Sequence, residues 1–293
     1  MLKQIKTLRW GYRALLAGAT AALCLPASAL AHTGEFERFN YCPSTTTGVK
    51  KCVISVTNGG EIILGKKTTP IVNKVTLQGG ITAVNEETNI AGFVGATNGI
   101  TLSKTPQPVP GGLLGIVPPE KSPPLVKLLS KFFFENELTG INATLELAKP
   151  ASEIEISTFN LLIEEGLALK LPVKVHLENP FLGSSCYVGS SSHPIIWNLT
   201  TGPTNPLAPN KSIHGQAGFP ELKEHNELVE ITENELVENA WATPEATGCG
   251  GILSFLVDPV IDSVIGLPAT DGNNTSILKN TIWSASVGAV NSH

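Results

Sequence analysis

The residue whose position offers the most specific chemistry is His32, which would begin the chain if cleavage followed Ala31. A free N-terminal amine and the imidazole of the same residue can chelate copper, and a second histidine completes such a site. The other histidines of the chain are His176, His193, His214, His225 and His293. None has a sequence context that identifies it as the partner, so His32 is a weak candidate for a metal ligand.

Carboxylates offer two further kinds of chemistry. Glu153 and Glu155 would share one face of a strand, and Glu164 adjoins Glu165. Two acids beside a sugar are what glycoside hydrolysis requires, but such pairs are also common on solvated strands. The seven glutamates within residues 221–238 could attract Ca²⁺, which prefers six to eight oxygen ligands. Apolar residues interrupt this run, which favours the solvated face of a hairpin or helix.

The motifs of the common enzyme classes are missing from the sequence. The segments nearest to the G-x-S-x-G elbow of serine hydrolases are 183–186 and 189–193, and neither fits. The H-E-x-x-H zinc motif, the P-loop, the EF-hand loop and the dinucleotide fingerprint are also absent. The sequence therefore predicts no catalytic residue and no cofactor.

Residues 1–31 have the order of a cleavable secretory signal peptide. Four basic residues precede an apolar stretch of 12 residues, and small residues follow it up to Ala29 and Ala31. Such a stretch is shorter than the ~20 residues that span a bilayer, so we expect cleavage after Ala31 or Ala29. Removal of 31 residues shifts the formal net charge from −5 to −9, which argues against a nucleic-acid partner. No later apolar stretch reaches membrane length.

The cysteine count agrees with export. Cys24 lies in the signal peptide, and four cysteines follow it. An even number in an exported chain predicts two disulfides, with three possible connectivities. We favour Cys42–Cys52 as a local link and Cys186–Cys249 as a long-range one. A four-cysteine zinc site needs close pairs, which this spacing does not provide.

Short runs rich in Val, Ile and Thr predict a mainly β, antiparallel, sandwich-like fold with one or two short helices. Asn58-Gly59-Gly60 and Asn98-Gly99 predict hairpins, because Asn and Gly accept positive φ. Gly79-Gly80 predicts the end of a strand, and Glu233-Asn234 predicts a turn between two paired strands. Further strands are expected over 143–147, 153–157, 167–178, 195–200 and 277–287, and a helix over 252–265.

Residues 105–124 are rich in Pro and Gly and predict an exposed connection between a β segment at 32–104 and another at 125–293. Residues 32–293 forming one single domain is the alternative. Residues 125–137 have helical spacing. Their aromatic run at 132–134 fits either a helix face packed on the sheet or an anchor for a membrane or partner.

Several segments together resemble a group of uncharacterised secreted proteins of actinobacteria. They are 42–52, TLQGG at 76–80, ENPFLGSSCYVG at 178–189, TGCGG at 247–251 and LPATDGNNT at 267–275. The resemblance implies export from a Gram-positive type of cell. It implies no activity, cofactor or catalytic residue.

The sequence thus predicts a secreted, non-enzymatic structural or binding protein of the extracellular or cell-surface compartment, with an unknown ligand there. The alternative is a secreted carbohydrate-active or copper-dependent enzyme that uses His32. A third possibility is a membrane-associated protein that uses residues 132–134.

Overall fold

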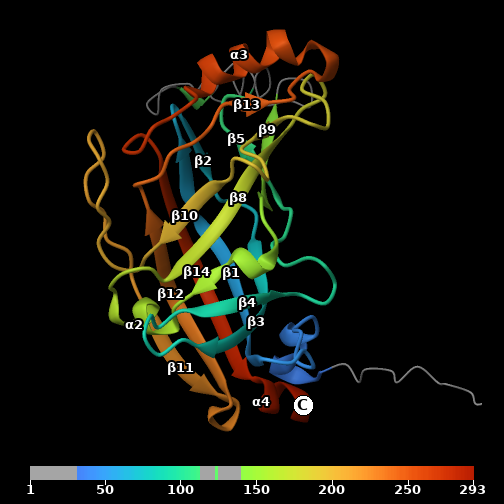
Figure 1. Ribbon diagram of the computed structural model, residues 1–293, viewed down its shortest axis with the longest axis vertical. Coiled ribbons are helices and arrows are strands. Elements are labelled where there is room, and N and C mark those ends of the chain that lie inside the picture. Colours follow the sequence, from blue (N-terminus) through green and yellow to red (C-terminus); the bar gives the residue numbers. More distant parts are fainter. Residues whose placement is uncertain (1–31, 113–122, 125–139) are drawn as a thin grey trace, which may run out of the picture. The chain divides into compact units, whose positions relative to one another are not determined.

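A computed structural model describes residues 32–112, 123–124 and 140–293. Residues 32–293 form one compact unit, built on a single sheet of 14 strands (Figure 1). The strands are β1 (Val49–Leu64), β2 (Lys67–Pro70), β3 (Val75–Val84), β4 (Ala91–Gly95), β5 (Pro106–Val109), β6 (Ile141–Leu147), β7 (Glu155–Ile156), β8 (Leu169–Glu178), β9 (Tyr187–Val188), β10 (Ile195–Leu199), β11 (Phe219–Lys223), β12 (Leu228–Glu238), β13 (Ala246–Thr247) and β14 (Thr275–Ser286). The helices are α2 (Thr158–Ile163), α3 (Ser254–Ile265) and α4 (Val287–Ser292), with 3-10 turns η1 (Gly34–Phe39), η2 (Ala151–Glu153), η3 (Glu224–Asn226) and η4 (Gly251–Leu253).

The sheet is antiparallel and curves back on itself. Its hydrogen-bonded order is β11-β12-β14-β1-β3-β4-β7-β8-β6-β5, and β10 also pairs with β8. Beyond β10, Thr200 and Val237 of β12 exchange backbone hydrogen bonds of 3.0 and 2.8 Å. In Figure 1, β8 and β10 cross over β14 and β1. The predicted mainly β, antiparallel, sandwich-like fold with short helices and two disulfides is therefore confirmed.

Three segments that the sequence predicted as a turn or as the end of a strand instead lie within long strands. β1 continues through Asn58-Gly59-Gly60 with a bulge, and β12 continues through Glu233-Asn234 with another. A Cβ on Gly60 would lie 2.0 Å from the backbone oxygen of Ile277, so glycine there permits close approach of β14 rather than a reversal. β3 likewise runs through Gly79-Gly80 to Val84. The predicted hairpins at Asn58 and Glu233, and the strand end at Gly79, are wrong.

The second Asn-Gly pair does form a turn, but not a hairpin. Gly99 has a φ of +75°, and its N–H donates to Ala96 O at 3.0 Å. Beyond the turn, Leu102 bridges to Leu77 of β3 rather than to β4. The chain therefore leaves β4 and returns along the neighbouring strand, so the hairpin predicted around Asn98-Gly99 is also wrong.

Alternating side chains of β1 reach two separate cores. Val53 belongs to the large apolar cluster inside the curved sheet. Cys52 and Ile54 belong to a smaller cluster that η1 and α4 cover with Phe36, Phe39, Ala289 and Val290. This alternation follows from the period of two in a strand, and it places Lys51, Val53 and Ser55 on the inner side. Beyond the bulge, the even-numbered Ile62 and Leu64 face the same core.

Both predicted disulfides are confirmed. Cys42–Cys52 joins the loop after η1 to β1, and Cys186–Cys249 joins the start of β9 to the segment after β13. The second bond closes 63 residues and lies beside α3. The strand at 277–287 and the helix at 252–265 correspond to β14 and α3, and Gly266 ends α3 with a φ of +86°.

Some predictions concern segments that the structure describes only in part or not at all. Within 105–124, Pro106–Val109 forms strand β5, which pairs with β6. The predicted helix over 125–137 and its aromatic residues at 132–134 lie outside the described residues.

Candidate functional site

A cavity of about 180 Å³ lies inside the curved sheet, at the end where α2 packs. Seven strands and α2 contribute its walls, and most wall residues are apolar. The central ones are Leu161 of α2, Leu169 of β8, Ile231 and Leu236 of β12 and Ile282 of β14. An engineered apolar cavity of ~150 Å³ stays dry and binds benzene, so this space suits a small apolar ligand.

The short helix α2 closes part of this end of the sheet. The Ser157 hydroxyl caps the helix by accepting the Asn160 N–H at 3.1 Å, and Glu164 ends it with a φ of 58°. Leu161 and Leu162 both line the cavity. Leu161 is buried, whereas Leu162 is 48% exposed. The cavity therefore reaches the surface beside Leu162.

Polar groups line the same end of the cavity. Lys51 of β1 is exposed and lines the cavity, together with the hydroxyl residues Ser55, Thr158 and Ser284. Among the described residues of this lining, Lys51 is the only titratable one. Within the described part of the chain, Lys51 forms no ion pair, and these three hydroxyls have no hydrogen-bond partner. The site thus combines an apolar interior with one positive charge and three hydroxyls that bond to no described residue.

Two smaller cavities follow inside the sheet. One of about 30 Å³ shares Ser55, Leu77, Leu169 and Leu236 with the first. Another of about 60 Å³ lies toward α3 and includes Lys67, whose pKa burial lowers.

A buried polar network lies beside the middle cavity, at the level of the two bulges. The Thr57 hydroxyl donates to Asn280 Oδ1 at 2.7 Å, and Asn280 Nδ2 donates to Asn234 Oδ1 at 3.2 Å. Asn234 Nδ2 donates in turn to the carbonyls of Gln216 and Ala217, both at 3.1 Å. All three network side chains are buried and mutually bonded, so the network serves to fix β1, β14 and β12 in register.

At the opposite end of the sheet, α3 turns its acids inward. Asp258 accepts the N–H groups of Gly248 and Cys249 at 3.2 and 2.7 Å, and Asp262 accepts that of Ala246 at 2.8 Å. Burial raises the pKa of Asp262.

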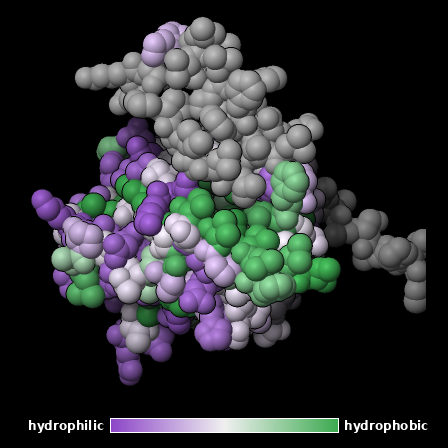
Figure 2. Space-filling model, turned by 90° about the horizontal axis from the view of Figure 1, so that it is seen from above, coloured by the Kyte–Doolittle hydropathy of each residue, from purple (hydrophilic) through white to green (hydrophobic). Residues whose placement is uncertain are grey.

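Apolar side chains of α3 and η4 face outward instead. Ile252 is 95% exposed and Phe255 69%, and Leu253, Leu256 and Val260 are exposed as well. Figure 2 looks onto this end and shows apolar residues gathered on one side of it. We call Ile252, Leu253, Phe255, Leu256 and Val260 together the α3 apolar face.

The structure gives the predicted chemical residues other partners, although His32 and His293 lie near each other because the Thr33 N–H donates to His293 O at 3.1 Å. The His32 N–H donates to Asn40 Oδ1 at 2.9 Å. His293 stacks on Phe36 and pairs with Glu227 at 2.9 Å, while His176 stacks on Tyr187 beside Glu178. Among the described residues, no three His, Cys, Asp or Glu side chains form a group that could hold a metal ion.

The predicted carboxylate pairs have other partners. Glu155 pairs with Lys170 at 2.6 Å, and Glu164 accepts the N–H of Ala217 at 2.8 Å.

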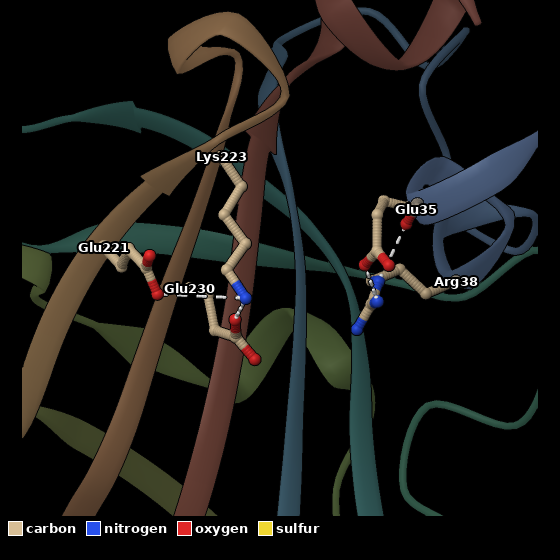
Figure 3. A network of polar contacts seen from close by, with 5 residues as sticks. All are labelled: Glu35, Arg38, Glu221, Lys223 and Glu230. Atoms are coloured by element: carbon tan, nitrogen blue, oxygen red, sulfur yellow. Dashed lines mark hydrogen bonds and ion pairs between the residues drawn. The ribbon is translucent and has the colours of Figure 1, made fainter.

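The glutamates of 221–238 lie mainly on β11 and β12. Lys223 bridges Glu221 and Glu230 across these two strands, and the Glu35–Arg38 pair of η1 lies nearby (Figure 3). Hydrogen bonding to Glu230 raises the pKa of Lys223. Glu238 is buried, which raises its pKa, and it accepts the N–H of Ala240. Ion pairs and contact with solvent therefore account for many of these seven glutamates.

Comparison with known proteins gives no further guide: no family model, curated protein or solved structure matches this chain. Within the described residues, no helix has both the length and the apolar character needed to cross a membrane.

Sequence reasoning missed the cavity. Its lining comes from eight elements between residues 51 and 284, so no local motif could reveal it. The only available signal was the alternation of Lys51, Val53, Ser55 and Thr57, which places two hydroxyls and a lysine on an inner strand face.

Proposed function

We propose that this protein is a secreted, non-enzymatic binding protein that holds a small apolar ligand inside its sheet. The observation that carries the proposal is the cavity of about 180 Å³ at the α2 end, with its apolar walls. Binding sites for small molecules are concave, mostly apolar and contain a few polar groups, as this one does.

Export is part of the proposal. The signal-peptide pattern of residues 1–31 supports it, and the two disulfides are consistent with an oxidising compartment. The resemblance to secreted actinobacterial proteins remains a prediction. A copper or carbohydrate enzyme has less support, because the residues proposed for it have other hydrogen-bond or ion-pair partners.

Calorimetric titration with 1-octanol tests ligand binding. Ser55 lines both the large and the middle cavity and has no side-chain hydrogen bond in the described structure, so Ser55→Phe fills the space without breaking a contact. We expect saturable binding by the unaltered protein and at least a tenfold loss in Ser55→Phe.

The matched control is Thr281→Phe, which adds the same ring to β14 at a residue that does not line the cavity. This variant should bind octanol as the unaltered protein does. Absence of saturable binding, or equal binding by Ser55→Phe, would overturn the proposal.

A further inference from the structure

The polar end of the cavity restricts the class of ligand. The described residues of its lining include one charged group, Lys51, and no carboxylate. The chain as a whole carries a formal net charge of −5, so this positive charge is not part of a generally basic surface. A ligand that filled only the apolar walls would leave the ammonium group to solvent, whereas an anionic ligand could pair with it.

We infer that the ligand is a small anionic amphiphile, such as a medium-chain carboxylate, with its chain among the apolar walls and its head group at Lys51. This inference rests on the proposed function and names the ligand class of the same site.

The position of Lys51 suits a head group. Its backbone pairs with Ile81 of β3 and Ser286 of β14, so the base of the side chain is fixed in the middle of three strands. Ser284 and Thr158 add hydroxyl donors from β14 and α2. Hydrogen bonds to a charged group are stronger than neutral ones, and an ammonium with two hydroxyls can satisfy several lone pairs of a carboxylate.

The apolar part fixes the approximate length of the chain. By comparison with the ~150 Å³ cavity that holds the six carbons of benzene, about six to eight carbon atoms fit. The middle cavity continues from the shared residues Ser55 and Leu236 toward the centre of the sheet. A linear chain therefore suits the space better than a wide ring system.

The test compares octanoate, 1-octanol and octylammonium, which share a chain and differ in head-group charge. With the unaltered protein, we expect octanoate to bind about tenfold more tightly than octanol, and octylammonium to bind more weakly than octanol. Lys51→Met should abolish the preference for octanoate over octanol.

Lys50→Met is the matched control. Lys50 is exposed, adjoins Lys51 and carries the same charge, but it does not line the cavity. This variant should keep the tenfold preference, because a general change in net charge does not move the head group.

The outcomes separate the two proposals. If octanol binds and octanoate binds no more tightly, or if Lys50→Met and Lys51→Met lose the preference equally, the inference is overturned while the binding function stands. If none of the three compounds binds the unaltered protein, both are overturned.

Discussion

The two ends of the curved sheet differ in the direction in which their apolar side chains point. At the α2 end, apolar residues face inward around an unfilled cavity, and the charged Lys51 lies where the cavity meets solvent. At the α3 end, two aspartates face inward and apolar residues face outward, beside a disulfide. The α3 end is therefore anchored by the long-range disulfide and the two aspartates, whereas the α2 end has the shorter Cys42–Cys52 link beside Lys51 and encloses the cavity. A cavity enclosed by an anchored fold is where a ligand can bind without disrupting the structure.

The largest expected effect is on the anchoring of the α3 end. Replacing Cys186 and Cys249 by Ala removes a link across 63 residues, which should lower the free energy of unfolding by ~4 kcal/mol. The same change at Cys42 and Cys52, which spans 10 residues, should lower it by ~3 kcal/mol.

Denaturant titration of the two variants measures this difference. A larger loss for the Cys42–Cys52 pair would mean that the long-range disulfide is not the main anchor, and the contrast between the two ends would fail.

A smaller effect is expected from the inward acids. Asp258→Ala leaves the N–H groups of Gly248 and Cys249 without their acceptor, which should cost about 1–3 kcal/mol of stability. The control is Glu245→Ala, an exposed acid of the same region, which should change stability by no more than ~0.5 kcal/mol. Equal effects in thermal unfolding would show that the aspartate does not hold this end.

The smallest effect concerns pH. Because burial raises the pKa of Asp262 in the folded protein, the folded state binds its proton more tightly than the unfolded state does. Ionisation of this group therefore lowers stability as pH rises from its ordinary value through the raised one. Asp262→Asn should gain stability relative to the unaltered protein over that window, by less than the loss expected for Asp258→Ala.

Unfolding measured from pH 3 to pH 8 on both proteins tests the sign. A relative gain that grows as the pH falls would contradict the assignment.

The sequence predicted the fold where local pattern and tertiary structure agree. The alternation in β8 and β14, the αL glycine after α3 and the pairing of the four cysteines all have local or countable signals. It failed at Asn58-Gly59-Gly60 and Glu233-Asn234, which form bulges within long strands, and at Gly79-Gly80, where the strand continues close to Phe93 of β4. The atoms that a Cβ on Gly60 would meet belong to β14, far along the chain, so the sequence alone could not distinguish a bulge from a turn.

The candidate site was less predictable than the fold. His32 and the glutamate pairs attract attention because their chemistry is visible in single residues. The cavity has no such residue, since it depends on the curvature that brings β12, β8 and β1 into one lining. Lys51 can be recognised as a candidate ligand-binding residue only when its neighbours in space are known.

The most direct measurement is a crystal structure of the protein with 8-bromooctanoate, in which the anomalous signal of bromine locates the chain. The account predicts bromine inside the sheet among Leu161, Ile231 and Leu236, with the carboxylate within ion-pair distance of Lys51 Nζ. A bromine signal on the α3 apolar face, or none inside the sheet at saturating ligand, would contradict it.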